Sequence, residues 1–413
     1  MRAFIILLFF SINPVYSQSK MDSFYKKNIK IAQCQYNNAL KANINSSKIP
    51  RTLTDKGDLK SVDIYDWTSG FFAGSLWYLY ELTGKEAWKK EAVHWTEILE
   101  PIQFWTGNHD VGFMINCSYG NGLRLTGNNE YNEIIINTAK SLSTRFNFMT
   151  GCIKSWNYRQ AWDQKTEWFF PVIIDNMMNL EILFLASKIT GDTTFKEIAI
   201  THAKNTMKNH YREDYSCYHV VDYDTITGEV KDKATCQGFT DESSWSRGQA
   251  WGLYGFVMCY RETNEVEFLN FAKNIADYIL NSPKVPKDNI PYWDYDIIES
   301  KSIPEWKYDG KKYSLLLRDS SAAAITSSAL LELSTYLLDG KKYYDYANQI
   351  IHNLSTNRYR AKLRETNYFI LKHSVGSFPH GNEIDVPLNY ADYYFLESLL
   401  RKRKIDSSKH LYK

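Results

Sequence analysis

The sequence has 413 residues, a length that fits two or three ordinary domains or one large single-core architecture. Its 49 lysines and arginines nearly balance its 47 aspartates and glutamates, which removes the electrostatic argument for nucleic acid as a partner. Aromatic residues make up 15% of the chain; most are expected in the core, although aromatic faces also stack on sugar rings.

The N-terminus has the pattern of a secretory signal peptide. After a charged start, residues 3–10 are apolar and residues 15–17 (Val-Tyr-Ser) end the segment with a small side chain. The apolar run is too short to cross a bilayer, and Pro14 would break a buried helix or strand. We therefore expect residues 1–17 to be a signal peptide and residues 18–413 to form one domain of a secreted or periplasmic protein, with no membrane partner.

Helical periodicity begins after this segment and continues to the C-terminus. Apolar residues at a spacing near 3.6 predict helices, in chain order, at 26–41, 70–83, 86–101, 110–126, 129–147, 173–190, 193–211, 245–262, 266–282, 319–337, 341–358 and 389–402. Two short segments between them, 217–221 and 294–296, are expected in loops with some extended structure. No linker rich in Pro, Gly or Ser divides the chain.

A repeated joint groups these helices into hairpins. Tripeptides ending in Gly or Asn close one apolar stretch and open the next, at 82–84, 125–127, 189–191, 262–264 and 338–340. Gly and Asn suit the left-handed residue that ends a helix. An aromatic residue follows each joint by four positions and can pack back on the preceding helix: Trp88, Tyr131, Phe195, Phe268 and Tyr344.

Twelve helices make six hairpins, which form either an open solenoid or a closed ring. The number six, together with the absence of a polar capping repeat at either end, favours closure. The predicted fold is therefore all-α, an (α/α)6 toroid.

Two acidic residues are candidates for chemistry. Asp110 follows His109 at the start of a predicted helix, where it could equally be an N-cap. Asp175 lies within the apolar run 170–180, where a charge is costly unless it is partnered or functional. Apolar neighbours should raise the pKa of Asp175 and make it a proton donor near neutral pH.

A third polar segment combines a cation with aromatic rings. Arg247 and Trp251 are four residues apart and share a helix face, close to Trp245. A guanidinium beside aromatic rings suits the carboxylate of an acidic sugar, although a core ion pair explains the arginine equally well. The nine histidines are scattered, there is no HExxH motif, and the six cysteines match no zinc pattern. We therefore expect no metal or other cofactor, and mostly buried thiols with one disulfide possible.

Five segments together carry a resemblance to a known family. In chain order they are 66–72 (DWTSGFF), the pair His109-Asp110, 173–179 (IIDNMMN), Trp245 to Trp251, and 389–394 (NYADYY). This chain resembles glycoside hydrolase family 88 over most of its length. The resemblance implies the six-hairpin toroid and action on oligosaccharides that end in a 4,5-unsaturated uronic acid.

The resemblance also implies a mechanism and a set of site residues. Two carboxylates in a sugar site usually indicate attack at the anomeric carbon, whereas members of this family hydrate the vinyl ether of the unsaturated sugar. Asp175 would protonate C4 and assist addition of water at C5, and Asp110 would be the second essential carboxylate. The residues expected to contact the sugar or form the pocket walls are Trp67, His109, Trp156, His219, Gln237, Trp245, Arg247 and Trp251.

The loop 372–381 falls where relatives contact the next sugar or its sulfate. Ser374 and Ser377 are therefore candidate ligands of a sulfated oligosaccharide, although a loop with Gly, Pro and Ser is more often only a loop. Two alternatives remain open: an unsaturated galacturonyl-rhamnose hydrolase of the same fold, and a non-catalytic carbohydrate-binding toroid.

Overall fold

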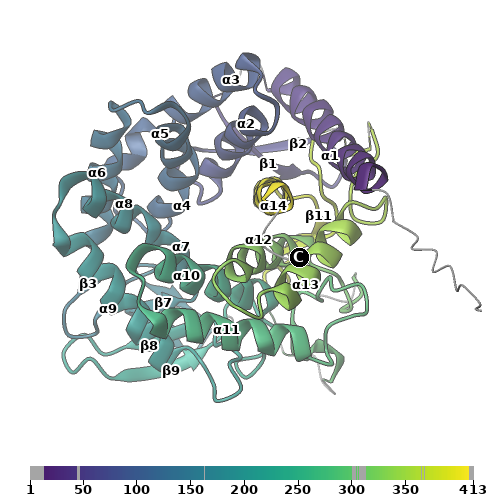
Figure 1. The fold of residues 1–413 in the computed structure, drawn as a ribbon. Coiled ribbons are helices and arrows are strands. Elements are labelled where there is room, and N and C mark those ends of the chain that lie inside the picture. Colours follow the sequence, from purple (N-terminus) through teal and green to yellow (C-terminus); the bar gives the residue numbers. More distant parts are fainter. Residues whose placement is uncertain are drawn as a thin grey trace, which may run out of the picture.

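The computed structural model describes residues 14–43, 47–161, 163–299, 304, 306, 313–363, 365–366 and 368–408. Helices alternate between an outer and an inner layer of a ring (Figure 1). The outer helices expose one face, whereas the long inner helices are buried along most of their length. The outer helices are α1 (Pro14–Ala42), α3 (Glu86–Glu97), α6 (Tyr131–Ser143), α9 (Thr193–Asn209), α11 (Val266–Asn281) and α13 (Lys341–Leu354).

The inner layer closes on itself. Around the ring, α2 contacts α4, α4 contacts α7, α7 contacts α10, α10 contacts α12, and α12 contacts α14, which returns to α2. This closure confirms the predicted (α/α)6 toroid and excludes an open solenoid. The inner elements are α2 (Ser69–Thr83), α4 (Val111–Ile115) with α5 (Asn121–Thr126), α7 (Asn176–Asn179) with α8 (Glu181–Thr190), α10 (Ser246–Thr263), α12 (Ser320–Ser334) and α14 (Asn389–Ser407).

Four of the five predicted joints have the expected left-handed residue. Gly84, Gly127, Gly191 and Asn264 end their helices with φ between +59° and +76°. The fifth assignment is wrong, because Gly340 has φ −57° and precedes α13 instead of capping α12. Glycine is needed there for another reason: a Cβ atom would lie 2.0 Å from the carbonyl oxygen of Ser334.

Three predicted helices are interrupted. The segment 110–126 contains a π-helical turn, η2 (Asn116–Gly120), between α4 and α5, and 86–101 ends at Glu97 before the 3₁₀ turn η1 (Glu100–Phe104). The segment 173–190 starts later than predicted, because Pro171–Ile173 pairs as strand β7 with β8 (Val220–Tyr223). The predicted extended segment 217–221 overlaps β8, whereas 294–296 overlaps the 3₁₀ turn η3 (Tyr295–Ile298).

Short antiparallel strands lie in the segments that connect the helices. β8 also pairs with β9 (Val230–Ala234), which gives a three-stranded sheet with β7. The other strands form two-stranded hairpins: β1 (Ile49–Leu53) with β2 (Leu59–Val62), β3 (Phe146–Asn147) with β4 (Cys152–Ile153), β5 (Arg159–Gln160) with β6 (Glu167–Trp168), and β10 (Ser374–Ser377) with β11 (Asn382–Val386).

A layer of four aromatic rings crosses the interior of the ring of inner helices. Phe71 packs on Phe113, Phe113 on Trp251, Trp251 on Tyr394, and Tyr394 on Phe71, with ring centroids 5.1–6.0 Å apart. All four side chains are buried. We call this layer the aromatic floor; it separates the N-terminal ends of the inner helices from their C-terminal halves.

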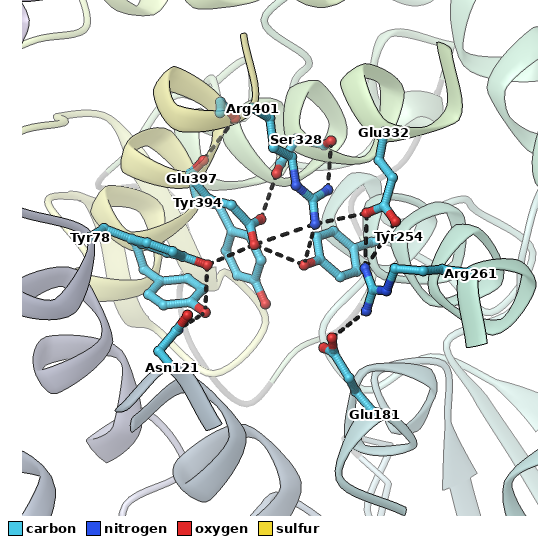
Figure 2. Close-up of polar contacts among 12 residues, drawn as sticks. Tyr78, Asn121, Glu181, Tyr254, Arg261, Ser328, Glu332, Tyr394, Glu397 and Arg401 are labelled. Atoms are coloured by element: carbon cyan, nitrogen blue, oxygen red, sulfur yellow. Dashed lines mark hydrogen bonds and ion pairs between the residues drawn. The ribbon is translucent and has the colours of Figure 1, made fainter. Parts of the chain in front are cut away.

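Below the floor, a charged network joins the inner helices around a cavity of about 400 Å³ (Figure 2). Arg261 of α10 binds both carboxylate oxygens of Glu332 of α12, at 2.9 and 3.0 Å, and also pairs with Glu181 of α8. Arg401 of α14 also contacts Glu332, at 2.8 Å. Tyr78 and Tyr254 both donate to Glu397. Ion pairs therefore connect the inner helices below the floor, and aromatic contacts connect them within it.

The predicted signal peptide lies mostly outside the described residues, whereas the prediction for the cysteines can be checked. Residues 1–13 lie outside the described residues, and residues 14–17 belong to α1, which begins at Pro14, a residue suited to a first helical position. Within the described ranges, no helix has both the length and the apolar character to span a membrane. All six cysteines are free thiols, five of them buried, so the possible disulfide is absent.

Candidate active site

The residues singled out in the sequence gather at the N-terminal ends of the inner helices. Trp67 lies just before α2, Asp110 before α4, Asp175 before α7 and Trp245 before α10. Trp67 packs on Tyr390, Trp245 packs on His219, and His219 lies 3.7 Å from Asp175, so the first residues of these helices meet at one end of the ring. The closed ring therefore assembles a site from segments that are far apart in the chain.

One carboxylate is held beside a neutral histidine. Nε2 of His109 lies 3.3 Å from Oδ1 of Asp110, and the amide of Asn179 donates to Nδ1 of the same ring at 3.4 Å. Since Nδ1 accepts, the ring proton is on Nε2 and faces Asp110. Burial lowers the pKa of His109 to about 3, so the imidazole stays neutral.

The second carboxylate has a similar neighbour. Nδ1 of His219 accepts from the backbone N–H groups of Cys236 and Gln237, so its Nε2 carries the proton and lies 3.7 Å from Oδ2 of Asp175. The backbone N–H of Ile174 donates to the carbonyl of His219, which fixes the two segments relative to each other. Burial lowers the pKa of His219 well below its ordinary value. Both candidate acids therefore face neutral imidazole N–H groups.

Burial changes the acidity of both carboxyl groups. It raises the pKa of Asp175 to about 7, against the opposing charge of Arg247. It raises the pKa of Asp110 to about 8, with a further contribution from the charge of Asp175. Two neighbouring carboxyls of this kind titrate as a pair. The pair consequently retains a proton at neutral pH, which an exposed aspartate would have lost.

Arg247 of α10 connects several segments at this end of the ring. Its guanidinium donates to the carbonyl oxygens of Val375 and Gly376, to Gln237 at 3.0 Å and to Asp319 at 3.2 Å. The side chain is almost completely buried. The core ion pair considered from the sequence is therefore present, and only Nε lacks a hydrogen-bond partner among the described residues. The predicted contact of Arg247 with a sugar carboxylate stays a prediction.

Aromatic side chains surround this end of the ring. Ring contacts connect, in order, Trp67, Tyr390, Arg247, Trp245, His219 and Trp156, with separations of 4.3–6.3 Å. Trp67 and Trp156 are partly exposed, as a surface that stacks on a sugar must be. Trp245 and Trp251 are buried, and Trp251 belongs to the aromatic floor beneath the site. The predicted residues therefore lie at one end of the ring, where two of the tryptophans are partly exposed and two are buried; their contact with a sugar stays a prediction.

The predicted serines lie in strand β10 at the same end. Ser374 is fully buried and its hydroxyl has no hydrogen-bond partner in the described part of the chain, whereas Ser377 contacts Nδ1 of His380 at 2.7 Å. Buried polar atoms normally find a partner. Several buried polar atoms at this end lack a hydrogen-bond partner among the described residues: His109 Nε2, Asp175 Oδ2, His219 Nε2, Arg247 Nε, Trp251 Nε1, Ser374 Oγ and the Tyr390 hydroxyl.

Sequence reasoning missed several residues that position the site. Asn179 joins the two acid segments, since its Oδ1 accepts from the backbone of Phe113 at 2.7 Å while its amide reaches His109. Gly112 permits this approach, because a Cβ atom there would lie 2.6 Å from the Cα atom of Asn179. Arg145 donates to the carbonyl oxygens of Thr106 and Ser155, and its charge acts to lower the pKa of Asp110. The available signal for Asn179 was its position four residues after Asp175, on the same helical face.

Comparison with known proteins identifies a family and its relatives. The family model described as Glycosyl Hydrolase Family 88 matches residues 40–282. An unsaturated glucuronyl hydrolase of Formosa agariphila is 43% identical over 364 residues, covering 88% of this chain and 86% of the relative.

Two solved structures are also similar. An unsaturated glucuronyl hydrolase specific for heparin superposes with a TM-score of 0.84 at 44% identity, covering 94% of this chain and 98% of the other. A mutant unsaturated glucuronyl hydrolase of a Streptococcus agalactiae strain, complexed with dGlcA-GalNAc6S, has a TM-score of 0.71 at 25% identity, covering 97% and 98%.

Proposed function

The chain belongs to glycoside hydrolase family 88, and on that premise we propose that it removes the terminal 4,5-unsaturated uronic acid from oligosaccharides produced by polysaccharide lyases. The observation that carries the proposal is the environment of Asp175. Its carboxyl is buried, its pKa is raised to about 7, and Oδ2 has no hydrogen-bond partner among the described residues. Such a group is a general acid at neutral pH.

The reaction uses the enol ether of the substrate. Asp175 transfers its proton to C4, and the ring oxygen stabilises the cation that develops at C5. Water adds at C5 and gives up a proton to the carboxylate pair, which restores the acid. The resulting hemiketal opens and the aglycone leaves. Asp110, with its own raised pKa, maintains the shared proton, and the N–H groups of His109 and His219 orient the two carboxyls.

Ultraviolet absorbance tests the proposed reaction directly, because hydration destroys the conjugated double bond of the unsaturated sugar. We expect wild-type protein to remove the absorbance of unsaturated glucuronyl disaccharides and to leave the matched saturated disaccharides uncleaved. Cleavage of the saturated compounds would place the attack at the anomeric carbon and contradict the proposal. Turnover restricted to unsaturated galacturonyl-rhamnose would favour the pectin-type enzyme, and binding without turnover would favour a non-catalytic toroid.

The pH dependence follows from the raised pKa values of the pair. A carboxyl whose pKa is raised keeps its proton to higher pH, so the acid form of Asp175 is present below about pH 7 and is lost above it. We expect kcat/KM to fall about tenfold per pH unit above this value. Initial rates from pH 5 to 9 on one unsaturated disaccharide check this limb. A rate that rises up to pH 9 would exclude Asp175 as the proton donor.

Two finer aspects of the function are also proposals. The complex of the Streptococcus agalactiae relative with dGlcA-GalNAc6S supports a sulfated substrate for this chain. The charged start, apolar run and small-residue end of residues 1–17 support export to the periplasm or the medium. Trp67, Trp156, Gln237, Ser374 and Ser377 are proposed to contact the bound oligosaccharide, on the basis of their shared location around the acids.

A further inference from the structure

A β-hairpin brings an arginine to the edge of the site. Strands β5 and β6 pair through Arg159 with Trp168 and Gln160 with Glu167. The guanidinium of Arg159 lies over the ring of Trp156 at 4.5 Å. No carboxylate of the described residues lies within ion-pair distance of it, unlike Arg247, which is paired with Asp319. Arg159 is thus a cation at the site that has no counter-charge in the described part of the chain.

The contact between Arg159 and His380 fixes the proton positions around it. One guanidinium nitrogen of Arg159 lies 3.4 Å from Nε2 of His380, and Nδ1 of His380 lies 2.7 Å from the hydroxyl of Ser377. A guanidinium only donates, so Nε2 accepts and the ring proton is on Nδ1, from which it is donated to the oxygen of Ser377. The hydroxyl hydrogen of Ser377 is then free to donate to a ligand. Burial lowers the pKa of His380 to about 4, so the positive charge of the group belongs to Arg159 alone.

The position of this group relative to Asp175 indicates which part of a substrate it meets. His219 faces Asp175, Trp156 packs edge-on to His219 at 6.3 Å, and Arg159 lies over Trp156. Two rings therefore separate the guanidinium from the acid. A group bound by Arg159 therefore lies on the far side of Trp156 from Asp175.

We propose that Arg159, stacked on Trp156 and supported by His380 and Ser377, binds an anionic substituent, a sulfate ester, on the sugar that follows the unsaturated uronic acid. This inference rests on the proposed function. The planar guanidinium of Arg159 contacts His380 and hydrogen-bonds Cys236, and its five N–H donors exceed these two contacts. Such a fork matches the oxygens of a sulfate, and the hydroxyl of Ser377 beside it adds a further donor. Arg159 would therefore determine specificity among substrates and take no part in the proton transfer.

The test compares kcat/KM for unsaturated disaccharides whose second sugar carries sulfate at oxygen 6, at oxygen 4 or on nitrogen 2, each beside its unsulfated counterpart. In Arg159→Gln we expect the ratio of sulfated to unsulfated kcat/KM to fall by roughly tenfold for at least one of these pairs, because a charge-assisted contact is lost. Arg159→Lys, which retains the charge but not the planar fork, is expected to recover part of this ratio.

Lys165→Gln is the matched control, since it removes the same charge from an exposed position on the same hairpin and should leave every ratio unchanged. Ratios unchanged in Arg159→Gln, or equal losses on sulfated and unsulfated substrates, would overturn the inference. Failure of the wild type on all of these disaccharides would instead contradict the proposed function.

Discussion

Asp175→Asn is expected to reduce kcat by roughly 10²- to 10⁴-fold while KM changes little, because the amide cannot supply the proton that C4 requires. The substitution keeps the shape of the side chain in a buried position. Loss of ultraviolet absorbance measures turnover, and retained binding of an unsaturated disaccharide is measured by calorimetry. A variant with normal kcat would remove Asp175 from the role of general acid.

The same substitution should not weaken the fold. A carboxyl whose folded-state pKa is raised to about 7 opposes folding at every pH above its unfolded value near 4, increasingly up to pH 7. An amide does not titrate and so does not oppose folding in this way. Asp175→Asn should therefore be at least as stable as the wild type at pH 7.5. At pH 3.5, where the carboxyl is protonated in both states, the variant should be no more stable than the wild type. Glu181→Gln is a matched control: it also replaces a carboxyl of raised pKa, but below the aromatic floor, and turnover should stay within about twofold.

Arg261→Leu is expected to destabilise the protein by about 3 kcal/mol at pH 7, because it leaves carboxylates facing one another without their shared cation. Arg261 pairs with Glu181, Glu262 and Glu332. The pKa of Glu332 is held at about 2 by Arg401 and Arg261 in spite of its burial. The midpoint of urea unfolding, compared at equal m-values, measures the loss.

Two comparisons make this prediction specific. The stability contributed by a carboxylate of depressed pKa is present above its unfolded value near 4.5 and is lost as pH falls toward 2. The deficit of Arg261→Leu should therefore shrink below about pH 4.5. Arg358→Leu, which removes an arginine that is 63% exposed and 3.3 Å from Asp288, should change stability by less than about 0.5 kcal/mol. Equal effects of the two substitutions would contradict the structural role of the network.

The architecture followed from local signals that act within a few residues. Apolar periodicity and the left-handed residues Gly84, Gly127, Gly191 and Asn264 predicted the hairpins, because helix formation and capping depend on near neighbours. The assignment of Gly340 was wrong because it used only the local tripeptide. The tripeptide 338–340 resembles the other joints, but α12 ends earlier, at Ser334. Helix interruptions at β7 and η2 depend on partners elsewhere in the fold and left no periodic signal.

The sequence predicted residues that the structure brings together, but it did not predict the contacts among them. Asp175 was recognisable because a charge within an apolar run needs a reason. The partners of Arg247 were not, since Asp319 and the carbonyls of Val375 and Gly376 lie 72 or more residues away in the chain. The stacking of Arg159 on Trp156 likewise depends on the β5–β6 hairpin, whose two-residue strands are too short to give a pattern.

The aromatic floor has a consequence for the order of events during turnover. Because Phe71, Phe113, Trp251 and Tyr394 pack across the interior, we expect substrate to reach Asp175 past the N-terminal ends of the inner helices. Substrate would then enter and product leave at the same end of the ring, and a polysaccharide could not pass through the ring from one side to the other. A site that is open at one end only accepts the terminal sugar of an oligosaccharide and excludes its internal sugars. On this expectation, each binding event releases one terminal sugar, whatever the length of the oligosaccharide that stays outside the ring.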